Sequence, residues 1–216
     1  MPGKKRNYRC VIYDCDGVLF DSLESNRKFY NHICYSLGRG AISDLELRFA
    51  HMRTVEEAVC HLFPDDPQSI RKALAMLPQI DPQEFIAYLT LEPNLLSAVH
   101  ALKKKGIFRA INTNRSDSMK PLMDRFELWP FFDLVITAAD VKNPKPHPES
   151  IEKILAKLNL KKKEAVFIGD SEVDRQAAES AGVKFIAYKN RSIAKESFID
   201  DHLKILNFIE DGQIFE

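Results

Sequence analysis

Five short apolar runs, separated by segments with helical periodicity, constrain the fold of this chain more than any other feature. The runs lack the alternation of a half-exposed strand, which is typical of parallel strands covered by helices on both faces. They span residues 10–13, 107–111, 134–137, 165–168 and 183–188. Apolar residues recur at helical spacing over 95–102, 119–126 and 151–158. Alternating strands and helices predict an α/β fold with a Rossmann-like, doubly wound parallel sheet.

The segment 22–91 interrupts this alternation. It contains no apparent strand but has helical patterns such as Phe29, Ile33 and Leu37, and prolines divide it into short helices. Its many large apolar residues argue against a disordered linker. We therefore predict a core domain over 1–20 and 92–216, with a helical domain inserted over 21–91.

Composition excludes several classes of protein. Lysine plus arginine number 31, as do aspartate plus glutamate, so the basic excess of a general nucleic-acid binder is missing. No run approaches the roughly 20 apolar residues of a membrane span, and acidic residues interrupt the apolar stretch that follows the basic N-terminus, so no signal peptide is expected. The four cysteines lack zinc-type spacing and are expected to be free, buried thiols. We expect a cytoplasmic protein that acts on a small molecule, without a nucleic-acid or membrane partner; its oligomeric state stays open.

The strongest motif is Asp14-Cys15-Asp16-Gly17, directly after the first apolar run. Side chains two residues apart on an extended chain point the same way, so both carboxylates can project beyond the end of the strand. Such close carboxylates repel each other unless a cation or a shared proton intervenes. Gly17 permits a sharp turn. A solvated turn is the alternative for an isolated pair, but an apolar strand that leads straight into the motif favours a functional site.

Two further motifs carry groups that suit an anion. Thr113 and Asn114 follow the second run at the expected start of a helix, where a hydroxyl and free amides can bind phosphate. A plain helix N-cap, a role that Ser116 could fill, is an equal alternative. Lys145 lies in the proline-rich segment 143–149, whose restricted backbone would hold the ammonium in place. The alternative is a surface lysine in a turn.

The fourth motif combines a strand end with two more carboxylates. The run 165–168 leads into Gly169-Asp170, and Asp174 follows four residues later. In a parallel sheet Asp170 leaves at the same edge as Asp14, and Asp174 can face the same place from one helical turn further. Oxygen ligands of this kind suit Mg²⁺.

Together, in this order, the four motifs resemble those of the haloacid dehalogenase (HAD) superfamily. The matching segments are DCDGVLFDS, INTNRS, NPKPHPE and FIGDSEVDRQAAESAG, and the resemblance extends from about Arg9 to Ile209. Within the superfamily the chain is similar to the branch of phosphoglycolate phosphatases and beta-phosphoglucomutases. That branch inserts a helical cap after the first motif, which implies a HAD-like core with a cap over 21–91.

The resemblance implies a mechanism and a metal site. Asp14 would attack phosphorus and form an aspartyl-phosphate. Asp16 would protonate the leaving oxygen and then activate the hydrolytic water. Mg²⁺ would be bound by Asp14, the backbone carbonyl of Asp16, and Asp170, with Asp174 assisting.

The resemblance also implies which residues bind the substrate. The phosphoryl oxygens would be held by Thr113, Asn114 and Lys145. Of these, Thr113 and Lys145 are expected to be catalytic residues. Arg115, from the core, and Arg53, from the cap, are candidates to bind a second anionic group, with solvated arginines as the alternative. His51 and Arg53 lie roughly where relatives carry a glycine-containing substrate loop, but this chain has no glycine there.

We therefore expect an enzyme, a Mg²⁺-dependent HAD phosphohydrolase. It would hydrolyse a small phosphate monoester, phosphoglycolate-like or a sugar phosphate. The second aspartate of the first motif, Asp16, favours phosphate chemistry over dehalogenation, because the dehalogenases of the superfamily lack it. A phosphomutase of the beta-phosphoglucomutase type and a non-catalytic module that binds Mg²⁺ and an anion are the alternatives.

Overall fold

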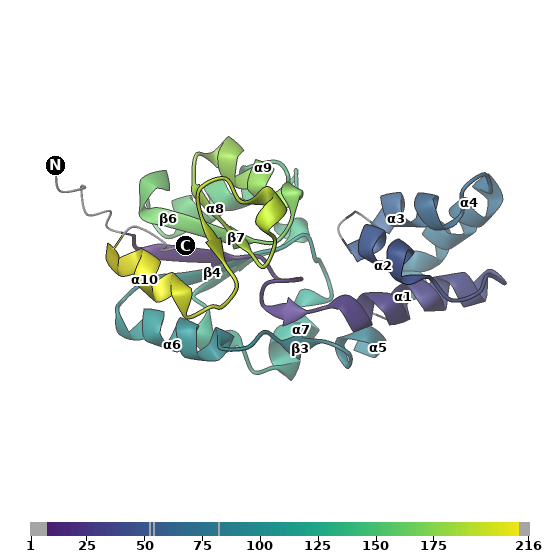
Figure 1. Ribbon diagram of the computed structural model, residues 1–216, viewed down its shortest axis with the longest axis horizontal. Helices are drawn as coiled ribbons and strands as arrows, with labels where there is room; N and C mark the ends of the chain where they lie inside the picture. Colours follow the sequence, from purple (N-terminus) through teal and green to yellow (C-terminus); the bar gives the residue numbers. More distant parts are fainter. Residues whose placement is uncertain (1–7, 52, 54, 82, 212–216) are drawn as a thin grey trace. The chain divides into compact units, whose positions relative to one another are not determined.

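The computed structural model describes residues 8–51, 53, 55–81 and 83–211. The chain divides into two compact units (Figure 1). The first contains Met1–Phe20 and Leu91–Glu216, and the second contains Asp21–Thr90. Each unit has its own buried core and is described separately.

The first unit is built on a six-stranded sheet with the order β5-β4-β1-β6-β7-β8, in which all paired strands are parallel. The strands are β1 (Cys10–Tyr13), β4 (Phe108–Asn112), β5 (Leu134–Ile136), β6 (Ala165–Gly169), β7 (Lys184–Tyr188) and β8 (Phe198–Ile199). The predicted doubly wound parallel sheet is confirmed. β8 was not predicted, because two residues are too few to show a pattern.

Helices cover both faces of this sheet. α8 and α9 lie on one face, and α6 and α10 lie on the other (Figure 1). The helices are α6 (Leu95–Lys104), α7 (Met119–Arg125), α8 (Glu149–Lys157), α9 (Glu172–Ala181) and α10 (Lys204–Asp211), with 3-10 turns at Trp129–Phe131, Ala138–Asp140, Lys162–Glu164 and Arg191–Ile193. All four residues of β1 are fully buried, which explains why the central strand is apolar without alternation.

The second unit is helical. It contains α1 (Leu23–Ser36), α2 (Asp44–His51), α3 (Val55–Leu62), α4 (Pro67–Met76) and α5 (Gln83–Ile86), with a 3-10 turn at Leu77–Gln79. Ile33, Leu47, Val59 and Leu62 meet in a core of its own, so the apolar stripes of the segment are buried within it. Pro67 occupies the first turn of α4, where a missing N–H costs nothing.

Short strands mark the two places where the chain passes between the units. β2 (Phe20–Asp21) pairs with β3 (Thr90–Leu91). The prediction of no strand over 22–91 is therefore wrong at Thr90–Leu91, where two residues were too few to show periodicity.

Two other predictions concern the cysteines and membrane helices. Cys10, Cys15 and Cys34 are buried free thiols, but Cys60 is exposed, against expectation. Within the described ranges, no helix combines the length and the apolar character that a membrane span requires.

Candidate active site

Three adjacent strands end within one residue of each other at the same edge of the sheet, and the first groups of the site follow them. Tyr13 of β1 is in register with Ile111 of β4 and Ile168 of β6. The residues that follow, beginning with Asp14, therefore leave the sheet together at its carboxyl edge. From β1 the chain adds β4 and β5 on one side of the sheet and then returns to add β6, β7 and β8 on the other side. Open parallel sheets bind ligands at the strand where the order reverses in this way.

Lys145 bridges two of the carboxylates. Its ammonium donates to Asp14 Oδ1 at 2.7 Å and to Asp174 Oδ1 at 2.6 Å. All three side chains are buried, so the ion pairs are poorly screened by solvent. The alternative of a surface lysine in a turn does not describe Lys145.

Asp170 completes a cluster of three carboxylates. One oxygen each of Asp14, Asp170 and Asp174 lies within 4.8 Å of the others. Two glycines permit this approach. A Cβ at Gly17, whose φ is +73°, would overlap the Asp170 carboxylate, and one at Gly169 would overlap the Asp174 side chain.

Burial and mutual repulsion perturb these groups. Burial raises the pKa of Asp14 to about 7; the charge of Asp174 adds to the rise and Lys145 opposes it. Burial, followed by the charges of Asp174 and Asp14, raises the pKa of Asp170 well above its usual range. Burial disfavours the Lys145 ammonium, but the carboxylates of Asp14 and Asp174 raise its pKa on balance. When all four groups are ionised they carry a net charge of −2, which suits a divalent cation.

Asn114 holds the main chain of Lys145. Its Nδ2 donates to the Lys145 carbonyl at 2.9 Å, and its Oδ1 accepts from the Lys145 N–H at 3.0 Å. The side-chain amide therefore fixes the loop that carries the ammonium. Thr113 is buried, and its Oγ1 accepts from the Arg115 N–H at 3.0 Å. The expected helix start at Thr113–Asn114 is wrong, because α7 begins only at Met119.

Arg115 makes a two-pronged ion pair with Asp16. Its Nε donates to Oδ2 at 2.7 Å and its Nη2 donates to Oδ1 at 2.6 Å. The carboxylate of Asp16 thus faces a guanidinium rather than the carboxylate cluster. This pairing could not be expected from a separation of 99 residues without the fold.

Two supporting residues were not predicted from the sequence. Ser171 caps α9: its Oγ accepts from the Asp174 N–H and donates to Asp174 Oδ2 at 2.6 Å. The Ser-x-x-Asp spacing is a signal that could have revealed this capping box. Asn190, 20 residues after Asp170, donates from Nδ2 to the Asp170 carbonyl at 2.8 Å, and no local pattern indicates that contact.

The second unit contains the other two candidates. Asn26 Nδ2 donates to His51 Nδ1 at 2.8 Å. Arg53 is exposed, and its guanidinium lies 5.4 Å from the centre of the Phe49 ring. Met52, between them, lies outside the described residues.

Comparison with known proteins identifies the family. The family model for haloacid dehalogenase-like hydrolases matches residues 11–188. Proteins named phosphoglycolate phosphatase are similar in sequence: one from Salmonella choleraesuis is 33% identical, covering 83% of this chain and 80% of that protein, and one from Rhodobacter capsulatus is 29% identical, covering 82% and 83%.

Solved structures agree. The crystal structure of a HAD-superfamily hydrolase, subfamily IA, variant 1, from Geobacter sulfurreducens is 36% identical with a TM-score of 0.80, covering 97% of this chain and 100% of that one. A haloacid dehalogenase-like family hydrolase from Streptococcus pneumoniae shares the fold, with a TM-score of 0.81 at 19% identity over 94% of this chain and 98% of that one. The protein is therefore an enzyme that belongs to the haloacid dehalogenase-like hydrolase family.

Proposed function

We propose that this hydrolase is a Mg²⁺-dependent phosphatase that cleaves a small phosphate monoester through an aspartyl-phosphate on Asp14. The observation that carries the proposal is the buried ammonium of Lys145, which contacts Asp14 and Asp174 while Asp170 lies within 4.8 Å of both carboxylates. A nucleophilic carboxylate, a fixed cation and a cluster of carboxylates are the parts that phosphoryl transfer needs.

The carboxylate cluster fits Mg²⁺. Asp14, which follows β1, and Asp170 and Asp174, which follow β6, offer hard oxygen ligands, and the single charge of Lys145 does not balance their three negative charges. We assign these three residues, with the backbone carbonyl of Asp16, as the groups that would hold the ion. When bound, Mg²⁺ would neutralise charge on the phosphoryl oxygens and favour the ionised form of Asp14.

We assign a separate chemical role to each of the residues Asp14, Asp16 and Lys145. The free oxygen of Asp14 would attack phosphorus as the ester oxygen leaves, and Asp16 would give that oxygen its proton. Asp16, now ionised, would take a proton from the water that opens the aspartyl-phosphate. Lys145 would balance the charge of the phosphoryl group, and the Thr113 hydroxyl and Asn114 would supply donors.

Phosphoglycolate-like compounds and sugar phosphates are the substrates we propose. The curated relatives are named phosphoglycolate phosphatases, which supports the first class. We assign the core to 1–20 and 92–216 and the cap to 21–91, in which the exposed Arg53 would bind a second anionic group of the substrate. Four free thiols fit a reducing compartment such as the cytoplasm.

The experiment is phosphate release from a panel of esters, with Mg²⁺ and with EDTA. The panel contains p-nitrophenyl phosphate, phosphoglycolate, hexose phosphates, nucleotides and pyrophosphate, and Asp14→Asn is the control. We expect release that requires Mg²⁺ and is abolished by Asp14→Asn. Release that persists in Asp14→Asn would exclude the aspartyl-phosphate. No release from any ester would exclude simple hydrolysis, and interconversion of hexose phosphates would then identify a phosphomutase.

A further inference from the structure

The ion pair between Arg115 and Asp16 lies in the core unit, and the arginine is held at both its side chain and its backbone. Two N–H groups of the guanidinium meet the two oxygens of the carboxylate at 2.7 and 2.6 Å. Nη1 also donates to Ser118 Oγ at 3.3 Å, and the Arg115 backbone N–H donates to Thr113 Oγ1 at 3.0 Å. Both ends of the arginine are therefore anchored by the loop that follows β4.

Asp16 needs such an anchor. Its side chain is 35% exposed, so packing alone does not select one orientation of the carboxylate. A group that transfers a proton must lie within about 2.6–3.2 Å of the atom it serves, and a displacement of about 1 Å can reduce a rate by about 10²-fold. A planar guanidinium fork fixes the plane as well as the position of a carboxylate, which a lysine ammonium does not.

We propose that Arg115 is a positioning residue that holds the carboxyl group of Asp16 in place for proton transfer. When Asp16 carries the proton for the leaving oxygen, one of its oxygens still accepts from the guanidinium, and the other is released from it and donates the proton. This inference rests on the proposed phosphatase function and deepens it. It differs from the role expected from the sequence, a clamp on a second anionic group, because three of the five N–H groups of the guanidinium are already engaged within the protein.

Two leaving groups separate the positioning role from other roles. p-Nitrophenolate leaves without much help from a proton, whereas an alkoxide requires one. The substrates are p-nitrophenyl phosphate on one side and, on the other, ethyl phosphate and glycerol 3-phosphate, which carry no second anionic group. The variants are Arg115→Lys, Arg115→Gln, Asp16→Asn and the double variant Arg115→Gln/Asp16→Asn. Arg9→Gln is the matched control, because it removes an arginine ion pair with Glu164 just before the start of β1, at the opposite edge of the sheet.

We expect both Arg115 variants to lower kcat on the alkyl phosphates by about 10- to 100-fold. On p-nitrophenyl phosphate the loss should be slight, and KM should change little for either class. Arg115→Lys should fail to restore the rate although it keeps the charge. Adding Arg115→Gln to Asp16→Asn should cost nothing further, because the arginine acts through the aspartate. Arg9→Gln should behave like the wild type.

Four results would each overturn this inference and leave the proposed phosphatase function standing. They are equal losses on both classes of ester, a wild-type rate for Arg115→Lys, an additional loss in the Asp16→Asn background, and a wild-type enzyme that cleaves p-nitrophenyl phosphate but no alkyl phosphate. If the wild type releases phosphate from none of these esters, the proposed function fails and the inference fails with it. Thermal midpoints of all variants, measured in parallel, separate a loss of the folded protein from a loss of orientation.

Discussion

Lys145 and Asp14 lie 131 residues apart in the chain, and the Lys145 ammonium donates to Asp14 Oδ1 at 2.7 Å. The same ammonium contacts Asp174, so one buried cation pairs with two carboxylates, one directly after β1 and one in the first turn of α9. Removing it would leave buried negative charges facing each other. Breaking a buried pair in this way is much more costly than losing an exposed one.

Lys145→Met is therefore expected to destabilise the metal-free protein by about 3–5 kcal/mol. Mg²⁺ should recover part of this loss, because it binds the folded carboxylate cluster and stabilises it by mass action. The measurement is the thermal midpoint in EDTA and over a Mg²⁺ titration. Lys120→Met is the control, since it removes only an exposed pair with Asp124 and should leave the midpoint almost unchanged. An Lys145→Met protein as stable as the wild type in EDTA would contradict the prediction.

Gly17→Ala tests the close approach of Asp170. The new Cβ would overlap the Asp170 carboxylate, and φ at this position is +73°. Gly106→Ala is a matched control, because φ is +72° there but no atom lies within 4 Å of the new Cβ. Each substitution should cost about 1–2 kcal/mol from backbone strain. Only Gly17→Ala should also weaken Mg²⁺ binding, by about 10- to 100-fold in calorimetry. Equal Mg²⁺ affinity in the two variants would show that Gly17 serves the turn and not the cluster.

The strand ends explain how much of the site could be predicted from sequence. Asp14 and Asp170 follow apolar runs directly, and parallel strands bring their carboxyl ends to one edge, so their proximity follows from the fold class. Lys145 is different. It lies in a loop whose path depends on Asn114, and the mutual bonds between that amide and the lysine main chain have no signature in the sequence.

Arg115 shows a second limit. A motif predicts that a residue lies near a site, but it does not predict the partner of that residue. Arg115 pairs with Asp16 because β1 and β4 are neighbours in the sheet, which brings together the loops that follow them. A third limit is the length of an element. The paired strands Phe20–Asp21 and Thr90–Leu91 have two residues each, which is too short for a periodic pattern that would identify a strand.

His202 provides a prediction for the pH dependence of stability. It is fully buried and its Nε2 donates to the Val18 carbonyl at 2.8 Å, while its ring stacks on Tyr188 with the centres 4.5 Å apart. Burial lowers the pKa of His202 to about 4. Between pH 6.5 and 4 the unfolded chain thus binds a proton that the folded protein does not. Stability should therefore fall as the pH falls through this window, by about 3 kcal/mol from this group.

Urea unfolding from pH 7.5 to 4.5 measures this effect. Substitution His202→Gln should remove that share of the pH dependence, so the stability gap between wild type and variant should be largest near neutral pH and shrink in acid. His100→Gln, which alters an exposed histidine on α6, should keep the wild-type slope. A constant gap between wild type and His202→Gln would refute a neutral, buried imidazole.

Substitution of Arg53 tests whether the helical unit binds a negatively charged group of the substrate. Its side chain is exposed, and its guanidinium contacts the face of Phe49, so the charge is available to a ligand. If it binds a second anionic group, Arg53→Ala should raise KM for phosphoglycolate by about 10- to 100-fold, the range for a hydrogen bond to a charged partner. KM for p-nitrophenyl phosphate, which has no such group, should stay unchanged, and kcat should change little for either ester.

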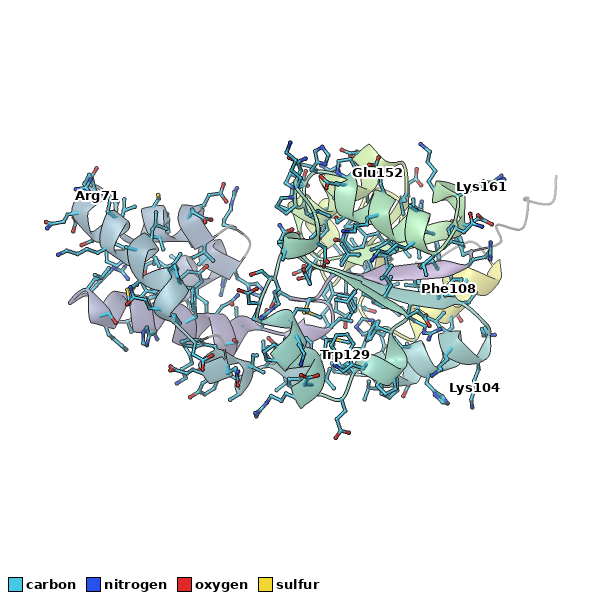
Figure 2. All side chains as sticks on the ribbon, turned by 180° about the vertical axis from the view of Figure 1, so that it is seen from behind. Arg71, Lys104, Phe108, Trp129, Glu152 and Lys161 are labelled. Carbon is cyan, nitrogen blue, oxygen red and sulfur yellow. The ribbon has the colours of Figure 1, made fainter. Side chains whose placement is uncertain are left out.

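Arg71→Ala is the control for Arg53. Arg71 is an exposed arginine in the same unit, on α4, and its side chain points away from the helices into solvent (Figure 2). It should leave KM unchanged for both esters. An equal rise of KM for the two esters in Arg53→Ala would mean that the arginine shapes the unit in general. No change for either ester would identify Arg53 as a solvated side chain, and the second anionic group would then have to be bound by the core.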